Sequence, residues 1–140
     1  MAGLSGSQPD VRTIADDEWL VRGVPRQHVL VSDQGTIFKD AAFNDREVSF
    51  SVLSLSGVQY LMAMPDAFAW LAAVNVGYCR HTIGVDAMVH RPEPSNPDHV
   101  VVILGTGRNR KARAMLQHAV MIRAEGTPEA VYDALRADVS

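Results

Sequence analysis

A chain of 140 residues is long enough to form one globular domain around a single core. Its hydrophobic content of 47% and charged content of 21% are ordinary for such a domain, and its net charge of −3 argues against a general nucleic-acid binder, which is usually strongly basic. The one cysteine, Cys79, excludes an internal disulfide and is typical of a reducing compartment.

The first ten residues are small and polar, so we expect a flexible N-terminal tail (1–10) ahead of one domain over residues 11–140. They show neither the basic nor the apolar region of a signal peptide. The longest apolar stretch, residues 60–76, contains Pro65 and Asp66 and falls short of a membrane span. We therefore expect a cytoplasmic protein without a membrane partner.

Short strand-forming runs separated by turn signals fill the first half of the domain. Residues 19–24, 28–31 and 36–38 are predicted as strands, and a turn over 33–35 joins the last two as a hairpin. Polar and apolar residues alternate over 47–53, and this period of two indicates a half-buried strand.

A helix is predicted next, because Ser56 and Gln59 match the capping-box pattern; it should run to Met64 and end at Pro65. Residues 68–74 fit either a helix or a buried strand, and we favour the strand. A short helix ending near Gly84, a strand over 85–90 and a loop with three prolines over 91–97 follow.

The clearest structural signal runs from Asn96 to Arg113. Residues 100–104 are a continuous β-branched and aliphatic run, typical of a central strand buried on both faces. A glycine turn then leads into an amphipathic helix with the apolar stripe Ala112, Met115, Leu116, Ala119, Val120 and Ile122. A last helix is predicted from the N-cap Thr127 and Pro128, with Val131, Ala134 and Leu135 on its inner face.

These elements predict an α+β fold: one small domain with a mixed sheet of about five strands and three to four helices packed on it. The sequence shows no internal repeats, heptads or low-complexity segments.

Basic residues crowd the start of the amphipathic helix, although cations at a helix N-terminus cost roughly 0.3–1 kcal/mol each. Free backbone N–H groups at the same place suit a phosphate or a carboxylate. One interpretation is therefore a site for an anionic ligand or an acidic protein partner, and the other is a solvated basic face. The candidate ligand-binding residues are Asn96, Gly105, Thr106, Gly107, Arg108, Arg110, Lys111 and Arg113.

His99 is the candidate catalytic residue, because it follows Asn-Pro-Asp at the mouth of the strand and an imidazole suits acid/base work at neutral pH. Arg80 could hold an anion together with Arg108. The simpler interpretations are that His99 or Asn96 satisfies the backbone of the proline-rich loop, and that Arg80 is a surface residue. Arg80 and His81, which are adjacent on a short helix, should point about 100° apart and not share one pocket fully.

No metal or cofactor is predicted. His81, His90 and His99 are nine residues apart, which matches no zinc pattern, and Gly105-Thr106-Gly107 is neither a P-loop nor a dinucleotide turn. Cys79 beside Arg80 could be an activated thiol, but a lone cysteine is more often a small buried core residue.

The pattern resembles a family of small uncharacterised bacterial proteins over roughly residues 19–123. The matching segments are Trp19-Leu20-Val21-Arg22, Ala41-Ala42-Phe43 with Val48-Ser49-Phe50, Arg80 with Gly84, and an Asn-Pro-x-His box at residues 96–99 before the strand and basic helix. The resemblance implies a similar architecture and carries no established activity. Asn44-Asp45-Arg46 and Gly105-Thr106-Gly107 depart from the lysine-containing segments of that family.

Arg22 and Ser49-Phe50-Ser51 also resemble the arginine and Ser-x-Ser positions of ADP-ribosyltransferases. The third member of that pattern would be a glutamate opening a late strand, and neither Glu125 nor Glu129 occupies such a place. The leading hypothesis is therefore a small bacterial binding or adaptor protein. The alternative is an enzyme on a phosphorylated or nucleotide-like substrate, with His99 as acid/base and Arg80 and Arg108 as anion holders.

Overall fold

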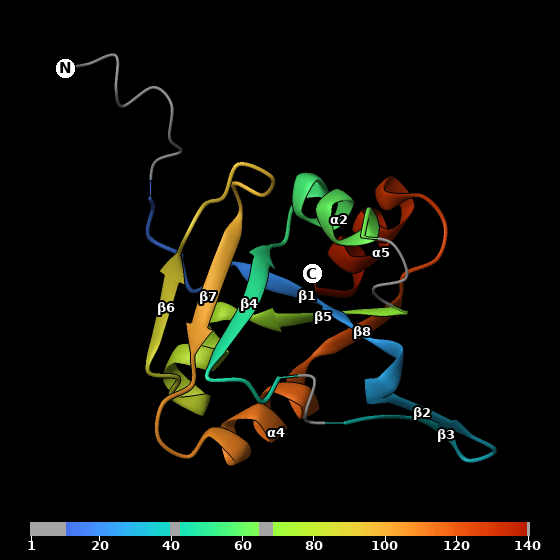
Figure 1. The fold of residues 1–140 in the computed structure, drawn as a ribbon, viewed down its shortest axis with the longest axis horizontal. Helices are drawn as coiled ribbons and strands as arrows, with labels where there is room; N and C mark the ends of the chain where they lie inside the picture. The colour runs from blue at the N-terminus through green and yellow to red at the C-terminus, as the bar shows by residue number, and fades with distance from the viewer. Residues whose placement is uncertain (1–10, 40–42, 65–68, 140) are drawn as a thin grey trace.

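A six-stranded sheet, antiparallel at every ladder, lies at the centre of the fold (Figure 1). The structure is a computed structural model that describes residues 11–39, 43–64 and 69–139. In spatial order the strands are β6 (Ala87–His90), β7 (His99–Ile103), β4 (Glu47–Val52), β1 (Trp19–Val24), β5 (Trp70–Asn75) and β8 (Val120–Arg123). Together with helices on both faces, this makes a single small α+β domain, as the sequence predicts.

Helices cover each face of the sheet. On one face, α4 (Arg108–His118) packs beside the short helices α3 (Val76–Tyr78) and η3 (Cys79–Ile83) over the apolar residues of β4. On the other face, α2 (Leu55–Met62) and α5 (Pro128–Val139) lie side by side over β1, β5 and β8 (Figure 1). Each face therefore has its own buried apolar cluster.

The sheet divides between β1 and β4. β1 pairs with β5 along its whole length, but with β4 only at Leu20–Val52 and Val21–Ser51. Beyond these two pairs the halves diverge, and Figure 1 shows β6, β7 and β4 running across the direction of β1, β5 and β8. Arg22 is the first residue of β1 past the end of that ladder.

A small hairpin stands apart from the main sheet. It follows the turn η1 (Arg26–His28) and consists of β2 (Val29–Ser32) and β3 (Gly35–Phe38), paired from Val29–Phe38 to Ser32–Gly35. Leu30, Val31 and Ile37 are exposed on it. Figure 1 shows the hairpin projecting from one corner of the molecule.

Most of the predicted elements are confirmed. β1 has the predicted bounds, the hairpin forms, and the ambiguous segment after Pro65 is the strand β5. In β4 the alternation holds, with Val48 and Phe50 buried and Ser49 exposed, although Ser51 is also buried. The short helix 76–83 ends at Gly84, whose positive φ of 79° is the left-handed conformation that glycine adopts at helix ends.

Residues 120–123 were predicted wrongly, as a continuation of the amphipathic helix. The helix α4 ends at His118, Ala119 is extended (φ −67°, ψ 143°), and β8 pairs with the edge of β5. Val120 and Ile122 fit both a helical stripe and an alternating strand, and β-branched residues favour the strand once a neighbouring edge is available.

The cap of α2 was also misplaced. Ser54, not Ser56, is the N-cap, and its Oγ accepts a hydrogen bond of 3.0 Å from the Gly57 N–H. Ser56 lies in the first turn and donates to a carboxylate oxygen of Asp98 instead, at 2.8 Å. The helix ends at Met62, while Pro65, its predicted terminator, lies outside the described residues, as does the tail 1–10.

The predicted central strand, β7, lies next to the edge of the sheet. Its residues 100–102 are buried as expected, but β4 and β1 hold the middle of the sheet. The main sheet also has six strands rather than about five, and its ladders are antiparallel rather than mixed. A short run of β-branched residues indicates burial, and says nothing of strand order or direction.

Candidate functional site

The predicted glycine turn after β7 forms as expected. Gly105 and Gly107 have positive φ values of 75° and 78°, and Gly107 is the N-cap of α4. A side chain at Gly105 would place its Cβ 2.8 Å from the Cβ of Asp86, so the turn also needs glycine for space.

The N-terminus of α4 has neither an acidic residue in its first turn nor a side-chain cap. The first hydrogen bond of the helix runs from the Lys111 N–H to the Gly107 carbonyl, at 3.0 Å. The backbone N–H groups of residues 108–110 therefore have no partner within the helix, and they lie at the positive end of its dipole.

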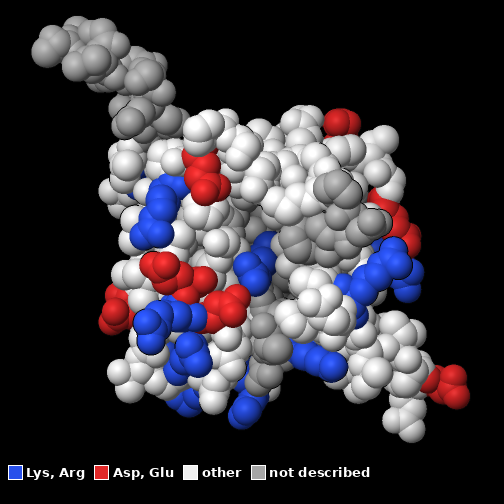
Figure 2. Space-filling view, in the orientation of Figure 1, with Lys and Arg blue, Asp and Glu red and all other residues white. Residues whose placement is uncertain are grey.

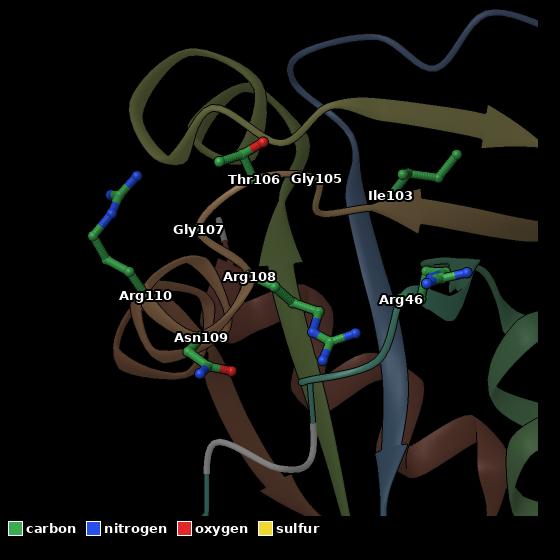
Figure 3. Close-up of a pocket in the computed structure, with 8 residues that line it drawn as sticks. All are labelled: Arg46, Ile103, Gly105, Thr106, Gly107, Arg108, Asn109 and Arg110. Carbon is green, nitrogen blue, oxygen red and sulfur yellow. The ribbon is translucent and has the colours of Figure 1, made fainter.

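An open cavity of about 810 Å³ lies at this turn (Figure 3). Figure 3 shows Arg108 pointing from the helix toward the side where Arg46 lies, while Arg110 points the other way. Figure 2 shows Lys and Arg side chains gathered around α4 at the lower edge of this face. We call the residues that line this cavity the arginine turn. They are Arg46, Ile103, Gly105, Thr106, Gly107, Arg108, Asn109 and Arg110.

Arg46 and Asn109 were not among the predicted site residues. Arg46 precedes β4, and the register pairs Glu47 with Ile103, so the residues before β4 must lie beside those after β7. Only the strand pairing reveals this proximity, because Arg46 is about sixty residues from the turn in sequence. The Oδ1 of Asn109 accepts a hydrogen bond of 2.7 Å from the Nδ2 of Asn44, which ties the loop before β4 to α4.

Three of the predicted ligand-binding residues lie elsewhere. Lys111 is only 8% exposed, and its Nζ donates to the Leu104 carbonyl at 2.8 Å. Asn96 is buried near the opposite end of β7, where its Nδ2 donates to the Ser51 Oγ at 2.6 Å. Arg113 is exposed on α4 and is not one of the residues that line the cavity.

Arg80 and His81 meet at one carboxylate. The Nη1 of Arg80 lies 2.9 Å from Oδ1 of Asp16, and the Nε2 of His81 lies 2.8 Å from Oδ2. Both contacts lower the pKa of the Asp16 carboxyl, and the hydrogen bond from Arg80 has the larger effect. The two side chains thus reach different oxygens of one exposed carboxylate, and neither of them lines the cavity of Arg108 or that of His99.

His99 is the first residue of β7, at the opposite end from the arginine turn. Its Nδ1 lies 2.9 Å from the Arg91 carbonyl, and the Oε1 of Glu93 lies 3.9 Å from the same nitrogen. The enzyme hypothesis needs His99, Arg80 and Arg108 at one substrate. Arg108 lines the cavity at the arginine turn without His99 or Arg80, and His99 lines a different cavity without either arginine.

A second cavity, of about 340 Å³, lies where the sheet divides, and we call it the split pocket. Its polar lining residues are Arg22, Ser49, Ser51, Tyr60, Glu93, Asn96 and His99. Arg22 and the two serines of Ser49-Phe50-Ser51 thus lie together, and His99, the first residue of β7, lies beside them.

The remaining candidates, Cys79 and His90, are both buried. Burial raises the pKa of the Cys79 thiol to about 12, so it is not an activated nucleophile at neutral pH. Nδ1 of His90 accepts from the Arg12 N–H at 3.0 Å, and its Nε2 lies 2.9 Å from the Pro97 carbonyl.

Within the described residues, no three His, Cys, Asp or Glu side chains group closely enough to hold a metal ion. No helix there is long and apolar enough to cross a membrane.

Comparison with known proteins adds no relative. No family model matches the chain, and no curated protein or solved structure gives a significant match.

Proposed function

We propose that this chain is a binding protein whose arginine turn holds the anionic group of a small ligand or an acidic protein partner. One observation carries the proposal: Arg46, Arg108 and Arg110, from segments far apart in sequence, line one cavity at an uncapped helix N-terminus. A bacterial origin and a cytoplasmic location are proposals from the sequence alone.

The electrostatics of the turn favour an anion. A cation in the first turn of a helix costs roughly 0.3–1 kcal/mol, and here two arginines adjoin backbone N–H groups that have no partner within the helix. A phosphate or carboxylate in the cavity would neutralise part of this charge and accept hydrogen bonds from the N–H groups. Binding would thus relieve an unfavourable arrangement that the fold itself creates.

The chemistry of the lining supports binding rather than catalysis at this cavity. General acid/base work needs a group that titrates near neutral pH. The described lining residues offer guanidinium groups, one hydroxyl and one amide, and they include no carboxylate, imidazole or thiol. In the enzyme hypothesis His99 acts together with Arg80 and Arg108, but His99 and Arg108 line separate cavities at opposite ends of β7, so we do not carry it forward in that form.

A thermal-shift experiment tests the proposal. Inorganic phosphate, pyrophosphate and a short polyglutamate peptide are titrated into the wild type and an Arg108→Gln, Arg110→Gln variant. At 100 times its dissociation constant, a ligand of the native state adds about 2.7 kcal/mol. We expect one of these anions to raise the melting temperature of the wild type and not that of the variant.

An Arg91→Gln, Arg123→Gln variant is the matched control, because it removes the same charge from other exposed positions. It should keep the full shift. Equal shifts in all three proteins would mean that the anion binds elsewhere, and no shift with any probe would contradict the small-ligand and acidic-peptide forms of the proposal alike.

A further inference from the structure

The split pocket combines fixed polar groups with a preformed hollow. It opens where β1 leaves β4 after the Val21–Ser51 pair, so two strands of the same sheet form its opposite walls. Figure 2 shows the surface hollowed in this region. A divided sheet leaves backbone groups without ladder partners, and the Nη1 of Arg22 crosses the division to donate to the Ser49 carbonyl at 2.8 Å.

Arg22 gives one end of the pocket a partly buried positive charge. Its side chain is 20% exposed, and burial lowers the pKa of its guanidinium, an effect that Asp45, 3.5 Å from Nη2, partly offsets. A cation in a partly desolvated wall interacts more strongly with a bound anion than a solvated one would. An anionic ligand group therefore belongs at this end, beside Ser49.

His99 gives the other end a hydrogen-bond acceptor. Its side chain is 13% exposed, and its Nδ1 must donate to the Arg91 carbonyl because a carbonyl oxygen only accepts. In the neutral ring Nε2 then carries a lone pair, and no hydrogen bond from the described residues to Nε2 is present. Fixing one nitrogen of a histidine in this way sets the role of the other.

The wall behind His99 is buried and hydrogen-bonded within the fold. Ser51 lies directly opposite His99 in the β4–β7 register, and both Ser51 and Asn96 are 1% exposed. The Nδ2 of Asn96 donates to the Ser51 Oγ at 2.6 Å, its Oδ1 accepts from the Asp98 N–H at 3.2 Å, and its carbonyl accepts from the His99 N–H at 3.2 Å. These bonds hold the backbone of His99, and the hydrogen bond from Nδ1 to the Arg91 carbonyl orients its ring.

The two ends of the pocket favour different ligand groups. Ser49, bonded to Arg22, and Ser51, opposite His99, are two residues apart on β4, a separation of roughly 7 Å. Each end has a carboxylate nearby, Asp45 beside Arg22 and Glu93 beside His99, but among the described residues that line the pocket only Arg22 has a guanidinium cation. A ligand with a phosphate at one end and a hydroxyl a few bonds away matches this polarity.

We propose that the split pocket binds a phosphorylated, hydroxyl-bearing small molecule of the sugar-phosphate or nucleotide class. The phosphate lies toward Arg22 and Ser49, and a hydroxyl donates to Nε2 of His99. This site is separate from the arginine turn, since the two lie at opposite ends of β7 and share no lining residue.

Isothermal titration of the full chain, with NMR of ¹⁵N-labelled histidine, tests the proposal. The probes are ribose 5-phosphate and AMP, with inorganic phosphate and ribose as the half-ligands. We expect ribose 5-phosphate or AMP to bind at least about tenfold more tightly than either half-ligand. The Nε2 resonance of His99 should move on saturation, because that nitrogen accepts a new hydrogen bond.

Three variants locate the binding. His99→Gln should weaken the phosphorylated probe by about tenfold or more, whereas His81→Gln, on an exposed histidine, should not. The Arg108→Gln, Arg110→Gln variant should retain this binding, which separates the result from that of the arginine turn. Circular dichroism confirms that each variant folds.

Three results would overturn the proposal. The first is no binding of ribose 5-phosphate or AMP at millimolar concentration. The second is binding that leaves the Nε2 resonance of His99 unmoved, and the third is binding that Arg108→Gln, Arg110→Gln abolishes while His99→Gln does not.

Discussion

Lys111 is a cation that the sequence places in a basic cluster and the fold places in the interior. Its Nζ donates to the carbonyl of Leu104, the residue that follows β7, and so ties α4 to the end of the strand. A buried carbonyl without a partner costs about 1–3 kcal/mol, whereas removing a cation from a helix N-terminus gains about 0.3–1 kcal/mol. The hydrogen bond therefore outweighs the charge effect.

Lys111→Met keeps most of the alkyl chain and removes the donor. We expect the free energy of unfolding to fall by about 1–2 kcal/mol, measured by urea denaturation. Arg110→Met is the control, because Arg110 is exposed and surface changes usually stay within about 0.5 kcal/mol. Equal losses in the two variants would show that the Lys111–Leu104 bond does not stabilise the fold.

At the scale of elements, α2 shows how local chemistry sets a boundary. Its N-cap Ser54 accepts from the Gly57 N–H and donates to Oδ2 of Asp98 at 2.7 Å, in the loop before β7. Ser56 donates to the same carboxylate oxygen but caps no backbone group. The two serines thus share a partner, but only Ser54 caps a backbone N–H and contacts the Val52 carbonyl, at 3.3 Å.

Ser54→Ala should therefore cost more than Ser56→Ala. Loss of a serine N-cap typically lowers the free energy of unfolding by about 1 kcal/mol, beyond the loss of the bond to Asp98 that both variants share. Chemical denaturation of the two single variants measures the difference. If Ser56→Ala proved the more destabilising, the cap would lie where the sequence pattern placed it.

Elements with a local signal could be predicted from sequence, and elements that depend on a partner could not. The alternation of β4 and the glycine at residue 84 carry their structure within a few residues. β8 becomes a strand only because β5 offers an edge, which the periodicity of residues 120–123 does not reveal.

The residues of the candidate site also differ in whether a local sequence pattern could predict them. The residues at 105–110 are contiguous, so sequence alone could group them. Arg46 joins them, and Arg22 joins His99, through the β4–β7 and β1–β4 pairings, which no local pattern specifies.

At the scale of the whole molecule, the segment before β1 fastens several elements together. The Arg12 N–H donates to His90 on β6, and the Arg12 guanidinium contacts Glu18 at 2.8 Å. The backbone carbonyls of Asp16 and Glu18 accept from Gly77 and Val76 at the start of α3. Burial raises the pKa of Glu18, but hydrogen bonds from Arg12 and the Ala15 N–H outweigh it, so the net shift is downward.

A lowered carboxylate pKa makes stability depend on acid. The contribution of Glu18 is fully present above its unfolded pKa, near 4.5, and is lost as pH falls through the lower folded value. We expect the melting temperature of the wild type to fall more steeply below pH 4.5 than that of Glu18→Gln. Glu125→Gln, which changes a side chain that is 72% exposed, should show the same pH dependence of the melting temperature as the wild type. Identical pH dependence in all three proteins would show that Glu18 does not contribute to the loss of stability in acid.

The projecting hairpin and the buried cysteine together make the chain easy to label. Cys79 is the only thiol, and its burial leaves it almost unreactive toward alkylating dyes at neutral pH. A Gln34→Cys substitution at the exposed hairpin tip would supply a single accessible attachment point. A fluorophore or surface tether placed there lies on an element that lines neither the arginine turn nor the split pocket.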